Sequence, residues 1–91
     1  MLSLRKLIQR IKYRQYRYQK NLSVIPVTSN KVVGRFDVRI MGPFPRVGDK
    51  LIGTDYYFGN RVAFTLEYID SPIPDIKNGY HFEGRIDGIL S

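Results

Sequence analysis

The sequence predicts a mainly β protein, in which one basic amphipathic N-terminal helix precedes a small antiparallel curled sheet or barrel of SH3-like or OB-like size. Three observations lead to this prediction. Apolar residues recur with a helical period near the N-terminus and with a period of two farther along the chain. Turn-forming residues separate the expected strands, which number about five or six. We therefore expect a helical arm over 1–21 and a β-domain over 22–91.

The basic arm, residues 1–21, has the pattern of an amphipathic helix. Its apolar stripe consists of Leu4, Leu7, Ile8, Ile11, Tyr18 and Leu22. A second stripe on the flank consists of Lys6, Arg10, Arg14 and Arg17. Cations four residues apart repel one another at a cost of roughly 0.2–0.5 kcal/mol per pair, and residues 1–20 contain no acid to compensate. The helix should therefore depend on docking to the β-domain or on an anionic partner.

Three segments alternate between apolar and polar residues, as half-buried antiparallel strands do: 31–41, 61–69 and 80–90. Residues 22–28 and 49–58 are predicted as additional strands. Turns are expected where Gly, Pro, Asn and Ser gather between the strands. The clearest of these are Ser29-Asn30, Gly59-Asn60, the Pro72 and Pro74 loop, and Asn78-Gly79.

The apolar phase of these strands predicts the core. Phe36, Phe64 and Phe82 fall in this phase on three different strands, and Tyr68 is expected on the same face as Phe64. Glycines inside the strands suit the bulges and bends that a closing sheet requires. They are Gly34, Gly53, Gly84 and Gly88.

Charge is distributed very unevenly along the chain. Residues 1–20 hold seven Lys and Arg and no acid, whereas 21–91 hold eight basic and eight acidic residues. The net charge of +7 therefore belongs entirely to the basic arm. A cationic arm on a neutral domain is typical of proteins that bind an anionic partner.

We interpret the basic arm as a polyanion-binding element, with RNA or ribonucleoprotein as the expected partner. Lys and Arg neutralise phosphates and release counterions. Interleaved tyrosines can stack on unpaired bases, which favours RNA slightly over duplex DNA. The predicted nucleic-acid-binding residues are Arg5, Lys6, Arg10, Lys12, Tyr13, Arg14, Tyr16, Arg17 and Lys20.

Two other kinds of partner fit the same sequence. A basic amphipathic helix can lie on an anionic membrane, with Leu4, Leu7, Ile8 and Ile11 inserted among the headgroups. A small protein-interaction module, of the inhibitor or immunity type, would combine a docking helix with a β-domain that binds a protein. Exposed sheet edges would also allow a homodimer.

Three consecutive aromatic residues, Tyr56, Tyr57 and Phe58, form a candidate contact platform before the predicted turn at 59–60. Neighbouring residues in a strand point to opposite faces, so at least one of these rings should leave the core face. It would either be exposed for stacking or protein contact, or take a covering role, at an end of the barrel or under the N-terminal helix. We favour the covering role from the sequence.

Nothing in the sequence indicates catalysis, so we predict a binding protein rather than an enzyme, with no cofactor and no metal. His81 is the single histidine and falls on the polar phase of its strand. The chain has no cysteine, which excludes disulfides and thiolate zinc sites and fits a cytoplasmic location. No apolar run approaches the length of about 20 residues that spans a bilayer.

Overall fold

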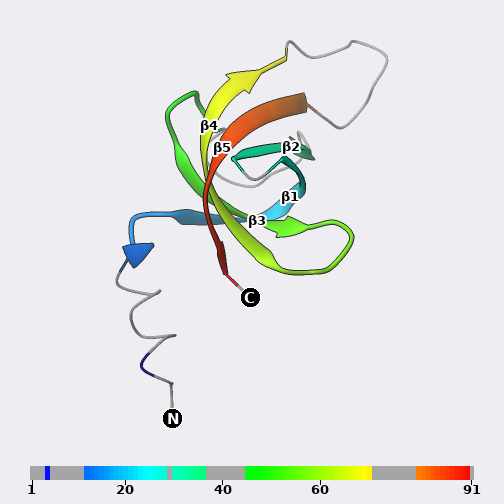
Figure 1. Ribbon diagram of the computed structural model, residues 1–91. Coiled ribbons are helices and arrows are strands. Elements are labelled where there is room, and N and C mark those ends of the chain that lie inside the picture. The colour runs from blue at the N-terminus through cyan, green and yellow to red at the C-terminus, as the bar shows by residue number, and fades with distance from the viewer. Residues whose placement is uncertain (1–3, 5–11, 29, 37–44, 71–79, 91) are drawn as a thin grey trace.

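Five strands close into a barrel in the computed structural model, which describes residue 4 and residues 12–28, 30–36, 45–70 and 80–90 (Figure 1). The strands are β1 (Arg17–Thr28), β2 (Lys31–Phe36), β3 (Lys50–Asp55), β4 (Arg61–Ile69) and β5 (Tyr80–Leu90). Their order around the barrel is β1-β2-β5-β4-β3. The mainly β prediction is confirmed, and the bounds of β4 and β5 agree with the alternating segments 61–69 and 80–90.

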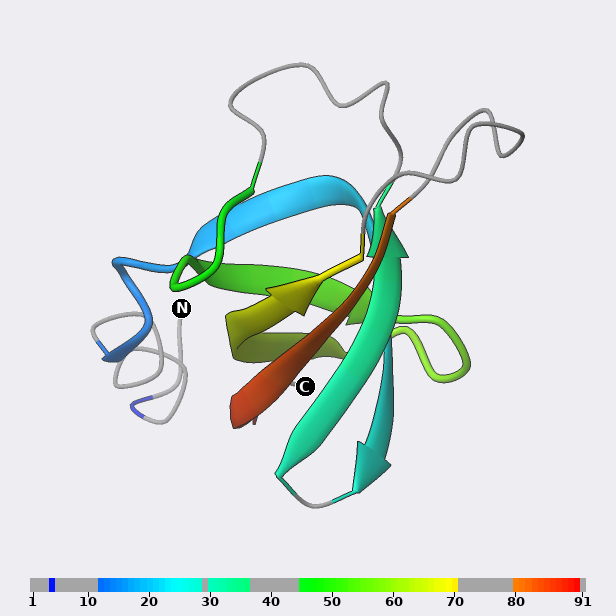
Figure 2. The ribbon, with the colours of Figure 1, turned by 90° about the horizontal axis from the view of Figure 1, so that it is seen from above.

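Strand pairing is antiparallel at every step around the barrel except one. β1 pairs with β3 in parallel, so a purely antiparallel sheet is a wrong prediction at this junction. The parallel pairing begins at Arg17 and Tyr18 and resumes at Ser23 and Val24 after a shift in register. Because β1 bends along its length, it can pair with β2 on one side and close the barrel against β3 on the other (Figure 2).

The predicted helix is wrong for residues 17–21, which form the beginning of β1. Tyr18 and Leu22 lie four residues apart, and this spacing fits the period of a strand as well as that of a helix. Arg17 and Tyr18 pair with Leu51 and Ile52 of β3, whereas repulsion among the cations of this stretch weakened the helix. Leu4 and Lys12 are helical, but residues 1–3 and 5–11 of the basic arm lie outside the described part of the chain, so the helix expected there stays a prediction.

The core is built around three phenylalanines that are buried, as predicted, and whose rings stack on one another. Phe36, Phe64 and Phe82 are all at most 2% exposed. The ring centroids of Phe36 and Phe82 lie 5.0 Å apart, and those of Phe64 and Phe82 lie 5.2 Å apart, with nearly parallel planes. Stacked aromatic pairs of this kind contribute beyond the area they bury, which makes this stack the centre of stability.

Two glycines on the inner face make room for these rings. A Cβ atom at Gly34 would overlap the Ser23 carbonyl oxygen and lie 2.6 Å from the ring of Phe82. A Cβ atom at Gly84 would lie 2.8 Å from the ring of Phe64. At both positions a phenylalanine ring approaches the glycine backbone closely. Glycines and large side chains are therefore combined on the inner face to fill the narrow interior.

One residue of the predicted core face lies outside it. Tyr68 is 53% exposed, because a shift in register between Leu66 and Tyr68 places a bulge in β4. Beyond the bulge the inward phase moves by one residue, and Ile69 packs against the core instead. The bulge therefore presents Tyr68 on the outer surface.

Candidate functional site

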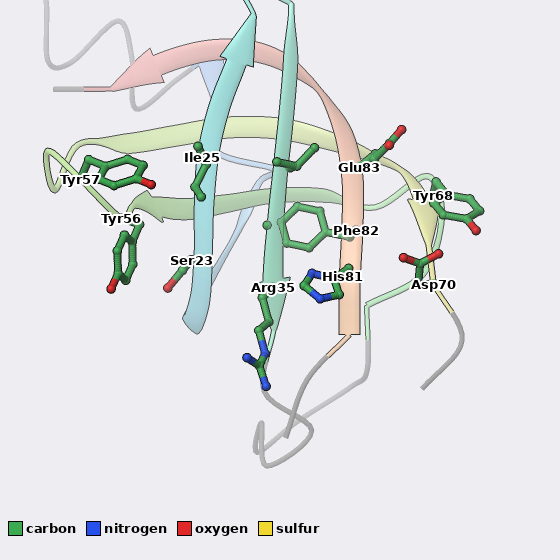
Figure 3. A pocket seen from close by; sticks show the side chains of 12 residues that line it. Ser23, Ile25, Arg35, Tyr56, Tyr57, Tyr68, Asp70, His81, Phe82 and Glu83 are labelled. Atoms are coloured by element: carbon green, nitrogen blue, oxygen red, sulfur yellow. The ribbon is translucent and has the colours of Figure 1, made fainter. Parts of the chain in front are cut away.

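A groove of about 580 Å³ lies on the outer face of β1, β2 and β5, and we call it the β1-β2-β5 groove. Ser23 and Ile25 of β1 contribute to its floor. Tyr56 and Tyr57 stand at one side of the groove, whereas Tyr68 stands at the other (Figure 3). Residues from four strands and one turn therefore form a single surface.

The strand register arranges the outward side chains of the groove in two rows. The first row, from β1 to β4, is Ile25, Val33, Glu83 and Tyr68. The second row, from β1 to β5, is Ser23, Arg35 and His81. The backbone N–H of Asp70 donates to the His81 carbonyl at 2.9 Å, so Asp70 extends the second row. The first row is mainly apolar and ends in an acid and a tyrosine, while the second is polar.

The Tyr56–Phe58 platform is part of a turn and not of a strand. The Asp55 carboxylate is buried and accepts hydrogen bonds from the N–H groups of Tyr57 and Phe58 at 2.8 and 3.2 Å. Gly59 closes the turn with φ of 74°, a conformation that favours glycine. All three aromatic side chains are at least 68% exposed, so the covering role favoured from the sequence is wrong. An aspartate-built turn rigidly displays these rings.

The end of the groove near β4 is acidic. Tyr68, Asp70 and Glu83 come together here from β4, the residue following it, and β5. A hydrogen bond with Asp70, followed by the negative charge of that group, raises the pKa of Tyr68 above its ordinary value. The acidic side chains at this end are those of Asp70 and Glu83.

A second feature is the docking of residues 12–16, which precede β1, on the outer face of the barrel. Tyr13 is only 8% exposed and lies so close above Gly88 that a Cβ atom there would overlap its hydroxyl group. That hydroxyl donates to the Asp87 carbonyl at 3.2 Å. Gly88 pairs with Ala63, another small residue, which leaves a flat seat for the ring. The structure thus places Tyr13 against the barrel and not on an open stacking surface.

Tyr16 is held by the side chain of Asp87. Its hydroxyl donates to Asp87 Oδ2 at 2.7 Å, and the Thr65 hydroxyl donates to the same oxygen at 2.6 Å. Burial opposes ionisation of Asp87, but these two hydrogen bonds, together with the positive charges of Arg85 and Lys50, outweigh it and hold the pKa of the carboxyl below its usual value. Burial, together with the hydrogen bond to Asp87, raises the pKa of Tyr16 to about 12.

The pair of Tyr16 and Asp87 should make stability depend on pH at both extremes. The lowered pKa of Asp87 stabilises the fold above the unfolded carboxyl pKa, and this contribution is lost as the pH falls through the folded pKa. The raised pKa of Tyr16 stabilises the fold below pH 10.0, and this contribution is lost as the pH rises to about 12. Tyr16→Phe should reduce stability by about 1 kcal/mol at neutral pH and weaken both dependences.

Urea unfolding of the wild type and of Tyr16→Phe, from about pH 2 to pH 12, tests this expectation. Tyr18→Phe is the matched control, because Tyr18 is half exposed and forms no part of the Asp87 cluster. Equal pH profiles for the wild type and Tyr16→Phe would contradict the expected role of the pair.

The described cations of the basic arm differ in their surroundings. Lys12 and Arg14 are exposed, whereas Arg17 Nη2 lies 3.6 Å from Asp49 Oδ2. Tyr18 is 50% exposed, and the guanidinium of Arg61 lies 5.3 Å from the centroid of its ring. The other predicted cationic residues lie outside the described part of the chain, or have no described side chain: Arg5, Lys6, Arg10 and Lys20.

His81 is exposed on β5 and pairs across the strands with Arg35. Within the residues that the structure describes, no three His, Asp or Glu side chains are grouped so that they could hold a metal ion. Over the same residues, no helix is long and apolar enough to cross a membrane.

No known protein family, curated protein or solved structure matches this chain. Inference about its function therefore depends on its own charge and geometry.

Sequence reasoning missed most of the groove residues and the docking role of Asp87. Alternation places Val33, Arg35 and Glu83 on the polar or outer phase, but it does not reveal which strands are neighbours. β2 meets β5 across a long interval of sequence, and this pairing creates the groove. The sequence does contain one signal near Asp87. The neighbouring Gly88 is a glycine inside a strand, and such a glycine often marks a place where another group approaches closely.

Proposed function

We propose that this chain is a non-catalytic binding protein that associates with RNA or ribonucleoprotein through its basic arm. The observation that carries the proposal is the location of the charge: residues 1–20 hold seven cations and no acid, and the remainder is neutral. Phosphate groups attract such a segment through counterion release, whatever their sequence.

Docking of the tyrosines supports this proposal by fixing where the cations are presented. Tyr13 and Tyr16 tie the end of the basic arm to the barrel, while Lys12 and Arg14 remain exposed beside them. A tethered cation loses less freedom on binding than one on a free tail, which improves affinity. Arg17 is already paired with Asp49, so it has a smaller role in phosphate binding than predicted.

Of the three interleaved tyrosines that the sequence offers for base stacking, we assign the role to Tyr18. Tyr13 is buried and Tyr16 is bound to Asp87, so neither offers a free ring face comparable with that of Tyr18. Tyr18 is half exposed next to Arg61, a combination that pairs a stacking surface with a phosphate ligand.

The salt dependence of RNA binding tests the proposal. Affinity for an oligouridylate should fall with salt with a log–log slope of roughly −3, from about 0.7 per neutralised phosphate on single strands and about four phosphates. The quadruple variant Lys6→Gln, Arg10→Gln, Lys12→Gln and Arg14→Gln should lose this slope. Fluorescence anisotropy titrations between about 50 and 200 mM salt provide the measurement.

A matched control removes the same charge from the barrel: Lys31→Gln, Arg35→Gln, Arg46→Gln and Arg85→Gln, all at exposed positions. This control should retain most of the slope if the basic arm is the binding element. Equal losses for both variants would contradict the proposal, since binding would then follow net charge alone. Tighter binding to anionic vesicles than to RNA, abolished by polar substitution of Leu4, Leu7 and Ile8, would replace RNA with a membrane surface.

A further inference from the structure

The β1-β2-β5 groove carries a charge opposite to that of the basic arm. Among the described residues of its lining, Arg35 is the one Lys or Arg, whereas Asp70 and Glu83 supply two carboxylates. A phosphate chain would meet net repulsion in the groove, while a basic segment would be attracted. The groove therefore fits a different partner from the one proposed for the arm.

The acidic end of the groove has the composition of a cation-binding site. Tyr68 is half exposed and offers a ring face, and Asp70 and Glu83 lie beside it. A guanidinium or ammonium group placed here would gain a cation–π contact and charge-assisted hydrogen bonds together. Tyr68 reaches this position because of the bulge in β4, which turns it away from the core.

The rest of the first row is apolar, and the turn beside it is held in place by hydrogen bonds. Ile25 and Val33 are partly buried neighbours in the first row, so they offer a flat aliphatic floor. Tyr56 and Tyr57 form the opposite wall, with ring centroids 5.4 Å apart and planes at 86°. Their turn is held by Asp55, and the N–H of Tyr56 donates to the Val24 carbonyl at 3.0 Å. An apolar ligand would meet a preformed surface here.

The width of the groove sets the length of its occupant. The row from Ile25 to Tyr68 crosses three spacings between neighbouring strands, which amounts to about 14 Å. A polyproline II segment rises about 3.1 Å per residue, so about four or five residues would cross the groove. Such segments dock in aromatic-lined grooves because their conformation is already formed before binding.

We propose that the β1-β2-β5 groove binds a short proline-rich segment of a protein partner, with an Arg or Lys side chain over Tyr68, between Asp70 and Glu83. The proline and aliphatic side chains of that segment lie on Ile25 and Val33, and its other end meets Tyr56 and Tyr57. This protein site is independent of RNA binding by the basic arm, and the two together would make the chain an adaptor within a ribonucleoprotein.

Titration of the full chain with two peptides, followed by chemical shifts of backbone amides, tests the proposal. The probes are acetyl-Pro-Leu-Pro-Pro-Arg-amide and the same peptide with Glu in place of Arg. The Arg peptide should shift amides in the outer rows of β1, β2 and β5 and in the 56–60 turn, with an affinity about ten-fold above that of the Glu peptide. Equal affinities, or no shift at these amides at millimolar peptide, would overturn the proposal.

Variants in the groove give a second measurement. Tyr68→Ala, and Asp70→Asn combined with Glu83→Gln, should each weaken the Arg peptide about ten-fold. Glu67→Gln is the matched control, because it removes an exposed carboxylate of β4 outside the groove and should leave the affinity unchanged. All three proteins should keep the RNA affinity of the wild type. An oligouridylate that displaces the Arg peptide from these amides would overturn the proposal and make the groove a nucleic-acid site.

Discussion

Phe64→Ala should destabilise the protein by about 3–5 kcal/mol, the range observed when a large buried aromatic side chain is truncated. Phe64 is fully buried and stacks on Phe82. The facing position is Gly84, which has no side chain that could move into the cavity. Since the total stability of a domain of this kind is about 5–15 kcal/mol, the variant should melt far below the wild type or fail to fold.

Phe58→Ala is the matched control for this prediction. It deletes the same atoms from a ring that is 81% exposed, so its effect should stay within about 0.5 kcal/mol. Thermal and urea unfolding of both variants, followed by circular dichroism, gives the comparison. A Phe64→Ala protein within about 1 kcal/mol of the wild type would contradict the central role of the aromatic stack.

The barrel core could be predicted from the sequence because strand alternation is a local property. Phe36, Phe64 and Phe82 each lie in a segment where every second residue is apolar, and all three are buried. The bulge after Leu66 could not be predicted in this way, because it depends on how β4 pairs with β5. This explains why Tyr68 was expected on the core face and is found on the surface.

The start of β1 illustrates a competition between local and tertiary preferences. The local pattern favoured a helix through residue 21, but the segment from Arg17 onward pairs with β3 instead. Hydrogen bonding to a neighbouring strand can override a weak helix propensity, and a run of cations without acids has weak helical support. Tertiary contacts also decide the role of Tyr13 and Tyr16. Tyr13 lies against Gly88 and Tyr16 donates a hydrogen bond to Asp87, and both partners lie near the other end of the chain, where a local pattern cannot reveal them.

The candidate site could be predicted only where its residues are contiguous in sequence. The exposed platform at 56–58 is visible as three adjacent aromatics, although its exposure depends on the turn that Asp55 builds. The groove could not be predicted, because its two rows exist only once β2 lies between β1 and β5. Strand order is a long-range property, and closed barrels of different order share the same alternation.

Gly34→Ala should destabilise the fold by about 3 kcal/mol, at the upper end of the cost of overpacking a core. The added methyl group would overlap the carbonyl oxygen of Ser23 and lie 2.6 Å from the ring of Phe82. A backbone oxygen cannot rotate away as the end of a flexible side chain can, and Ser23 is held beside Arg35 in the β1–β2 ladder. The overlap could be relieved if β1 moved away from β2. A shift of β2 away from β1 is blocked by β5, the other neighbour of β2.

Gly59→Ala separates this steric effect from the general cost of replacing a glycine. Gly59 has nothing within 4 Å of an added Cβ, but its φ of 74° disfavours any other residue. Its substitution should therefore cost only about 1–2 kcal/mol, the penalty for a left-handed backbone conformation. Urea unfolding should rank the proteins wild type, Gly59→Ala and Gly34→Ala in order of falling stability. A Gly34→Ala protein at least as stable as Gly59→Ala would contradict the prediction. It would mean that β1 and β2 lie farther apart at Gly34 than they do in this barrel.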